Sequence, residues 1–79
     1  MEIKVQYFGM LAEITGRASE LLTVDNDLSV RALRERIQAQ YPAIGNKKYK
    51  VAVNLQISGD EVHISPQAEV ALLPPFAGG

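Results

Sequence analysis

Apolar and polar residues alternate at the start of the chain with the period of two that is typical of a β-strand. Ile3, Val5 and Tyr7 fall on one face, and Phe8 falls on the other together with the polar residues between them. Similar extended segments follow at residues 20–24, 49–54 and 69–73, and shorter ones at 55–57 and 61–64, around the turn SGD. The pattern therefore predicts at least four strands.

A different spacing predicts one main helix in the middle of the chain. Val30, Leu33, Ile37 and Tyr41 recur three and four residues apart, after the segment DNDLS, which offers several candidate N-caps. Pro42 disfavours helical geometry at the residue before it, so we expect the helix to end at Tyr41. The segment MLAEITG, after the first strand, predicts about one and a half further helical turns.

The order of these elements predicts an α+β fold. A mixed sheet of four to five strands, mostly antiparallel, is expected to pack around the main helix. The first and last strands have no chain connection between them, so they can lie side by side and parallel at the centre of the sheet. That arrangement is the β-grasp fold of ubiquitin. We expect one domain over residues 1–73 and a flexible, extended C-terminal tail over residues 74–79.

Composition excludes several classes of function. The chain has 79 residues, 47% of them hydrophobic and 22% charged, which favours one small folded domain. It has no cysteine, so no disulfide, thiol nucleophile or cysteine-ligated zinc site is expected. The net charge is −1 and the basic cluster is limited to Lys47, Lys48 and Lys50, which predicts no nucleic-acid partner. Without a long apolar run or a signal sequence, a cytoplasmic location away from membranes is expected.

The segment after the last strand is the most informative chemically. Pro74 and Pro75 lack amide hydrogens, so they end the strand ladder and begin a stiff spacer. Six residues reach at most about 20 Å beyond the body. Glycine at the last two positions leaves no side chain to block a narrow channel. The predicted insertion tail consists of Pro74, Pro75, Phe76, Ala77 and Gly78, and it carries Gly79 at its end.

Gly79 would carry the one group able to react at the tip of this tail. An α-carboxylate is ionised at neutral pH and is a poor electrophile, because a nucleophile would add negative charge to an existing anion. The carboxylate therefore needs activation. Conversion to an acyl-adenylate by a partner's ATP would supply a good leaving group for attack by sulfur or by an amine.

The whole chain resembles the small, sulfur-carrying subunits of molybdopterin synthase, which are ubiquitin-like proteins. The resemblance lies in IKVQYFG, in Glu13 shortly before Gly16, in SVRALRERI, in VAVN and above all in EVALLPPFAGG. Two features depart from the family pattern. Ala12 stands where the family often has a basic residue, and SPQAE stands where a turn like Asp-Gly-Asp is common.

The resemblance implies a sulfur-transfer role with the chemistry at Gly79. An E1-like, ATP-dependent enzyme would form a transient adenylate there, and delivery of sulfur would give a C-terminal thiocarboxylate, 1-thioglycine. The tail would then enter the large synthase subunit, where sulfur passes to cyclic pyranopterin monophosphate to build the dithiolene of molybdopterin. The catalytic pocket would belong to that large subunit, the complex would be a heterotetramer, and the chain would bind no cofactor of its own.

A second set of candidate residues concerns partner binding. If the first set of alternating residues faces the helix, then Phe8 and Leu73 project from the opposite face of the sheet as neighbours near the tail. Ile57 is expected to extend this apolar patch. The family docks its partners with this surface, so the resemblance implies that Phe8, Ile57 and Leu73 bind the large subunit.

Other polar residues are expected to have structural roles. His63 has no carboxylate or second ligand near it in the sequence and is expected at the surface, and Asp25 and Asp27 are expected to be caps or turn residues.

Three alternative functions stay open: the related sulfur carrier of thiamin thiazole synthesis, a ubiquitin-like protein modifier joined to lysine by an isopeptide bond, and an interaction domain whose terminal glycines have no role.

Overall fold

The computed structural model describes residues 1–75. Four residues of the predicted tail, Phe76, Ala77, Gly78 and Gly79, lie outside the described residues. In chain order the elements are β1 (Glu2–Tyr7), α1 (Met10–Thr15), β2 (Ser19–Thr23), β3 (Leu28–Ser29), α2 (Val30–Gln40), a 3₁₀ turn η1 (Pro42–Ile44), β4 (Lys50–Val53), β5 (Gln56–Ile57), β6 (His63–Ile64) and β7 (Glu69–Leu73).

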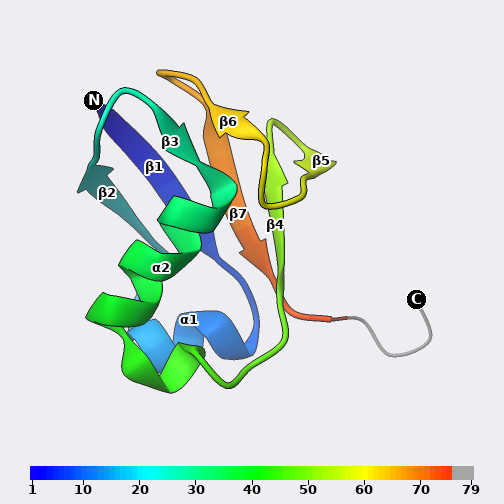
Figure 1. Cartoon of the computed structure of the whole chain (residues 1–79). Coiled ribbons are helices and arrows are strands. Elements are labelled where there is room, and N and C mark those ends of the chain that lie inside the picture. The colour runs from blue at the N-terminus through cyan, green and yellow to red at the C-terminus, as the bar shows by residue number, and fades with distance from the viewer. Residues whose placement is uncertain (76–79) are drawn as a thin grey trace.

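The strands form a mixed five-stranded sheet in the order β2-β1-β7-β4-β5. β1 and β7, the first and last strands, pair in parallel, with Val5 opposite Val70 and Tyr7 opposite Leu72, and the other neighbours are antiparallel. Figure 1 shows α2 crossing one face of this sheet, with α1 near the helix's C-terminal end. The predicted α+β, ubiquitin-like fold, with parallel first and last strands, is therefore confirmed.

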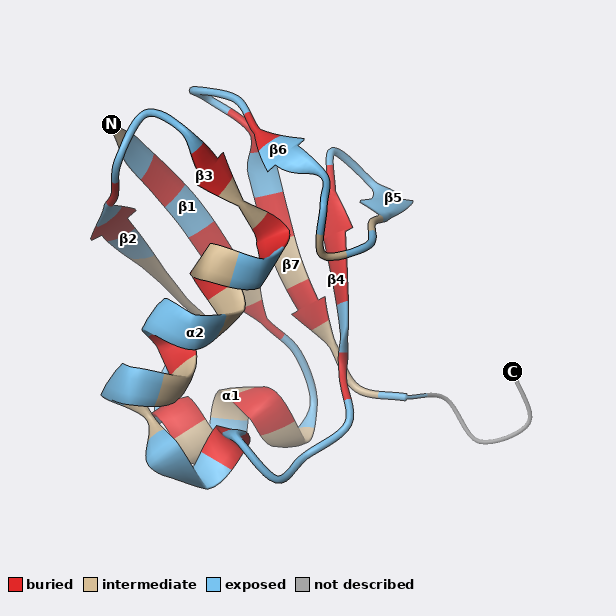
Figure 2. Cartoon of the chain, viewed as in Figure 1, coloured by how far each residue is buried: buried red, intermediate tan, exposed pale blue. Residues whose placement is uncertain are grey.

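The hydrophobic core lies between α2 and the sheet face that the helix covers. Alternate residues of each long strand point into it, which appears as red bands along the strands in Figure 2. Its largest fully buried side chains are Ile3, Leu11, Leu33, Ile37, Ile44, Ile64, Leu72, Val5, Val30 and Val70. The inward positions predicted from the alternation are thus buried, and the opposite sheet face has no helix over it.

Local chemistry sets both ends of α2. Ser29 is the N-cap, and its hydroxyl accepts a hydrogen bond from the backbone N of Ala32 at 3.1 Å. Tyr41 is the C-cap and Pro42 follows it, as the sequence predicted. Asp25 and Asp27 do not cap the helix, because the chain between them and the helix first forms β3; they lie in the connection between β2 and β3, in agreement with the other role expected for them, that of turn residues.

Two features of this region were missed by the sequence-based prediction. The first is the tight turn between β4 and β5, made by Asn54 and Leu55, both with positive φ (51° and 69°); the predicted turn at SGD follows β5, where Val62 N donates to Gly59 O at 3.1 Å. The second difference is β6, which leaves the main sheet and pairs with β3, so that Ile64 lies opposite Leu28. The short extended segment at 61–64 was predicted from the sequence, but β3 and its pairing with β6 were not. Within residues 1–75 no helix combines the length and apolarity needed to span a bilayer.

Candidate functional site

The end of β7 brings the base of the tail beside the end of β1. The parallel register sets Leu72 opposite Tyr7, and the backbone N of Phe8 donates to the carbonyl of Leu72 at 3.2 Å. The next residues, Phe8 and Leu73, point to the uncovered sheet face. Phe8 is 44% exposed and Leu73 is half-buried, so both apolar side chains are at least partly accessible near the base of the tail.

Ile57 lies on the same sheet face, one row further from the tail. It pairs with Ala52 of β4, which in turn pairs with Ala71 of β7. Ile57 is 58% exposed, whereas Ala52 is buried beneath its neighbours. We call the surface formed by Phe8, Ala71, Leu73 and Ile57 the outer apolar patch. It spans the sheet from β1 to β5 on the side that α2 leaves open.

Gly9 fixes the position of the first tail proline. Its backbone has φ 56° and ψ −131°, a conformation that L-residues with a side chain rarely adopt. A Cβ built on Gly9 would lie 3.0 Å from Cγ of Pro74. The glycine therefore lets the chain turn from β1 into α1 while Pro74 packs directly against it. Sequence reasoning missed this contact, because Gly9 and Pro74 are far apart in the chain.

Replacing Gly9 by alanine is expected to damage both the fold and the tail base. The positive φ and the close approach to Pro74 together should lower the free energy of unfolding by about 2 kcal/mol, as expected for a strained position. Urea unfolding monitored by circular dichroism measures this change. Gly59→Ala is the matched control, because a Cβ at Gly59 meets no atom within 4 Å and its φ is not in the left-handed region. Equal losses in the two variants would contradict the proposed role of Gly9.

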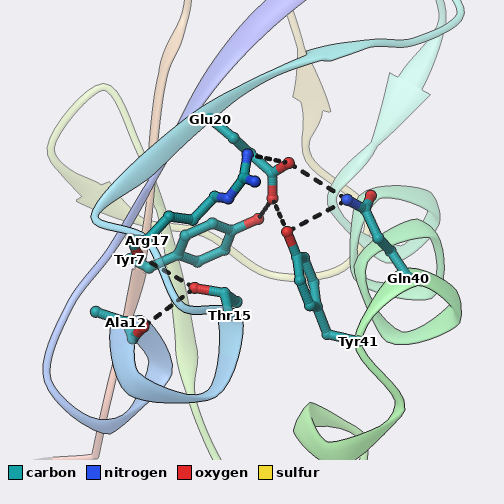
Figure 3. A network of polar contacts seen from close by, with 7 residues as sticks. All are labelled: Tyr7, Ala12, Thr15, Arg17, Glu20, Gln40 and Tyr41. Atoms are coloured by element: carbon teal, nitrogen blue, oxygen red, sulfur yellow. Dashed lines mark hydrogen bonds and ion pairs between the residues drawn. The ribbon is translucent and has the colours of Figure 1, made fainter.

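A buried carboxylate joins the sheet to the end of α2. Glu20 of β2 points to the core side of the sheet, and its side chain is only 6% exposed. Its Oε2 accepts hydrogen bonds from the Tyr7 hydroxyl at 2.5 Å and from the Tyr41 hydroxyl at 2.8 Å. Arg17 Nη1 lies 3.5 Å from Oε1, and Gln40 donates to the same oxygen at 3.4 Å (Figure 3).

This network shifts the proton affinities of its members. Desolvation of the Glu20 carboxyl alone would raise its pKa, but the hydrogen bonds from Tyr7 and Tyr41 and the charge of Arg17 favour the ionised form, so the net pKa is lowered. Burial is the largest cause that raises the pKa of the Tyr7 hydroxyl well above its usual value, and the hydrogen bond to Glu20 is the second. The pKa of Tyr41 is raised for the same reasons. The group is a structural clamp that holds β1, β2 and α2 together.

His63 also has a partner that the sequence did not reveal. Its Nδ1 lies 2.8 Å from Oδ1 of Asp27, because the pairing of β3 with β6 brings the two segments together. Both side chains are largely exposed, so the predicted surface position of His63 is confirmed. Among residues 1–75, no group of three or more potential ligands is arranged to hold a metal ion.

The described residues therefore offer an exposed apolar surface and an anchored Pro74 rather than a catalytic pocket. The hollow nearest the tail base is shallow and is lined by Gln6, Tyr7, Phe8, Gly9, Ala18 and Ser19. No nucleophile and general base are aligned there.

Comparison with known proteins gives relatives over nearly the full length. The chain is 28% identical over 83 residues to the molybdopterin synthase sulfur carrier subunit of Homo sapiens, covering 99% of this chain and 94% of the relative. It is also 28% identical over 92 residues to small archaeal modifier protein 3 of Haloferax volcanii, covering all of both chains.

Solved structures show the same fold. A putative molybdopterin converting factor subunit 1 from Pyrococcus furiosus superposes with a TM-score of 0.90 at 20% identity, covering 96% of this chain and 99% of the other. A complex of subunits 1 and 2 of the molybdopterin-converting factor from Helicobacter pylori contains a chain that matches with a TM-score of 0.69 at 22% identity over the whole of both chains. The model of the ThiS family matches residues 5–79, nearly all of the chain, and the protein therefore belongs to the ThiS family.

Proposed function

We propose that this protein is the sulfur carrier subunit of a molybdopterin synthase. The observation that carries the proposal is the near full-length similarity to a molybdopterin synthase sulfur carrier subunit, in a chain whose central strand β7 runs directly into Pro74 and Pro75. The tail base lies beside the outer apolar patch. A partner that covers the patch would therefore also receive the tail.

In the proposed mechanism the carboxylate of Gly79 is the working group. It attacks the α-phosphorus of ATP on an E1-like partner, which forms the acyl-adenylate and releases pyrophosphate. Hydrosulfide from a donor then displaces AMP and leaves a thiocarboxylate. The large synthase subunit takes up the tail, the thiocarboxylate sulfur bonds to cyclic pyranopterin monophosphate, and water cleaves the acyl–sulfur bond to restore the carboxylate of Gly79. Pro74, Pro75, Phe76, Ala77 and Gly78 act as the inserted spacer.

The folded body contributes positioning to this mechanism. β7 lies at the centre of the sheet with hydrogen-bonded strands on both sides, and Leu72, two residues before Pro74, pairs with Tyr7 of β1 and with Val51 of β4. Pro74 is further fixed by its contact with Gly9. A firmly held base limits the conformations that the tail must lose when it enters a partner, which favours binding.

Mass spectrometry of the protein from its native cell tests the proposal. A thiocarboxylate raises the mass of the intact chain by the difference between one sulfur and one oxygen, and the added mass should map to the C-terminal peptide. Cells that lack the adenylating enzyme serve as the control and should contain only the carboxylate. A chain that never carries the extra mass, even while molybdopterin is being made, would refute the proposal.

A second candidate function is supported by one of the relatives. The similarity to small archaeal modifier protein 3 favours a protein modifier, in which the activated Gly79 would form an isopeptide bond with a lysine of a target. The same mass spectra distinguish the two functions, because a modifier gives lysine-linked adducts of the chain. A sulfur carrier for thiamin thiazole synthesis would also carry a thiocarboxylate, and it is distinguished by which purified acceptor system consumes the sulfur.

Charged substitutions in the outer apolar patch are expected to weaken binding to the large synthase subunit. Phe8→Asp and Leu73→Asp each place a carboxylate where an apolar contact is proposed, at a cost of about 2 kcal/mol or more, which is at least about thirtyfold in the dissociation constant. Isothermal titration with the purified large subunit measures the effect. The patch is outside the core, so the fold should be retained.

The control for these variants is Leu55→Asp. Leu55 is 90% exposed and lies at the turn between β4 and β5, away from the end of β7, so the same change of charge should leave the affinity nearly unchanged. Wild-type affinity in both patch variants would show that the partner does not bind this surface. In that case the tail could still react, since the patch and Gly79 are tested separately.

A further inference from the structure

The hydrogen bonds at both ends of the edge strand β2 show which of its residues direct their backbone groups toward β1. At one end Met1 N donates to Val24 O at 2.7 Å and Val24 N donates to Met1 O at 2.8 Å. At the other end Tyr7 N donates to Ala18 O at 2.8 Å. In an antiparallel ladder the paired residues alternate along each strand. The even-numbered residues of this strand therefore direct their backbone groups toward β1.

The odd-numbered residues Ser19, Leu21 and Thr23 direct their backbone groups away from β1, toward the free side of the sheet. The orientation is confirmed at Thr23, whose carbonyl accepts a hydrogen bond from Arg36 Nη1 at 2.9 Å. In the part of the chain that the structure describes, no strand pairs with this side, since β2 ends the sheet order (Figure 1). Apart from the Thr23 carbonyl, which already accepts one hydrogen bond, the outward backbone groups of β2 pair with no strand within residues 1–75.

This edge lacks the devices that usually prevent strand addition. Proteins protect exposed edges with proline, with charged residues in the strand or with bulges. β2 has the sequence SELLT, with no proline and no lysine or arginine, and its one charge, on Glu20, is turned into the core. Leu21 is 64% exposed on the uncovered face, opposite Lys4 of β1. An apolar side chain thus stands in the middle of an open edge.

We propose that the protein self-associates through β2, with two copies pairing antiparallel about a two-fold axis at Leu21. In this register the Leu21 backbones of the two copies exchange hydrogen bonds, and Ser19 of each copy lies opposite Thr23 of the other. The cross-strand neighbours on the outer face are leucine with leucine and serine with threonine, both favourable pairs. The Thr23 carbonyl has a second lone pair, so the bond from Arg36 is compatible with this pairing.

Charges at the two ends of the strand agree with the same register. If the same register continues beyond the strand, Arg17 of one copy lies opposite Asp25 of the other. The two-fold axis repeats this pair at the other end. Both residues are exposed, and the Arg17 side chain keeps 53% of its surface free while one nitrogen contacts Glu20. A shift of the register would lose these opposite-charge pairs and the contact between the two leucines. The edge is therefore complementary to a second copy of itself.

The association is weak and leaves the tail base outside the contact. An edge of five residues buries far less surface than a stable dimer interface, so the dimer forms only at high protein concentration. β1 lies between the contact strand and β7. Leu73 and Pro74 therefore stay free in the dimer, and self-association does not depend on the function proposed for the tail.

Sedimentation equilibrium of the full chain over a wide range of concentration tests the proposal. The apparent mass of the wild-type protein should rise toward twice the monomer mass. Leu21→Lys brings two like charges together across the axis and should reduce the association constant by about tenfold or more. Leu55→Lys introduces the same charge at a different exposed leucine and should associate as the wild type does. Circular dichroism checks that all variants fold.

A mixing experiment gives the sharpest version of this test. Leu21→Lys and Leu21→Glu should each be monomeric alone, and an equimolar mixture should recover association, because a lysine then lies opposite a glutamate. A wild-type protein that stays monomeric at every concentration overturns the proposal. So does a loss of association in Leu55→Lys equal to that in Leu21→Lys, or a mixture that fails to recover.

Discussion

Deletion of Gly79 is expected to abolish sulfur transfer to the pterin while leaving the folded body unchanged. The carboxylate would then belong to Gly78, one residue short of its place in the activating site and in the large subunit. Reacting atoms must meet within about 3–3.5 Å, and one residue of extended chain spans about 3.3–3.6 Å. The loss should therefore exceed about a hundredfold in a reconstituted assay, since a misplacement of only about 1 Å costs that much.

Two companion variants make this result interpretable. Gly79→Ala keeps the carboxylate in place and adds one methyl group, so it should lower the rate less than the deletion does. A variant with extra residues after position 79, verified by mass spectrometry not to be trimmed, removes the free carboxylate from Gly79 and should be inactive. Full pterin sulfuration by that extended variant would show that Gly79 is not the carrier. Circular dichroism of all three should match the wild type.

The long, regular elements could be predicted because their patterns repeat several times. β1 and β7 each show an alternation that spans the whole strand, and α2 shows its apolar spacing over three turns and ends at a proline. The order of elements allowed β1 and β7 to be parallel neighbours, and the structure pairs them in this way. The outward positions of Phe8 and Leu73 followed from the same alternation, once the inward set was assigned to the core.

The missed features all depend on contacts between residues far apart in the sequence. Gly9 and Pro74 meet only because β1 and β7 are parallel neighbours that end together. His63 finds Asp27 only through the pairing of β3 with β6. A sequence pattern records which face a residue occupies, but it carries no information on which side chain of another segment lies opposite.

Glu20 is the one missed residue for which the sequence held a signal. Alternation places it on the same face as Leu22, so a carboxylate occupies a position that should point into the core. A charged group at such a position is costly unless it is paired and hydrogen-bonded. The pattern thus predicts that partners exist. That the partners are the hydroxyls of Tyr7 and Tyr41 could be learned only from the structure.

Loss of the Glu20 carboxylate is expected to cause the largest destabilisation of any single change in the clamp. Glu20→Ala leaves the Tyr7 hydroxyl and the Arg17 guanidinium without their acceptor, and should lower the free energy of unfolding by about 3 kcal/mol. A domain of this size has a total of only about 4–12 kcal/mol. Urea unfolding measures the change. Glu35→Ala, at an exposed position on α2, is the control and should shift stability by no more than about 0.5 kcal/mol.

The pH dependence of stability separates this clamp from simple packing. Because the pKa of folded Glu20 is lowered, its contribution is present above the unfolded value of 4.5 and is lost as the pH falls through the folded pKa. Because the pKa of folded Tyr7 is raised, stability declines as the pH rises past the unfolded value of 10.0, where only the unfolded state ionises. Glu20→Gln should therefore flatten the acid side of the stability profile, and Tyr7→Phe should flatten the alkaline side. Profiles that keep the wild-type shape in both variants would contradict the clamp, since packing alone carries no titrating group.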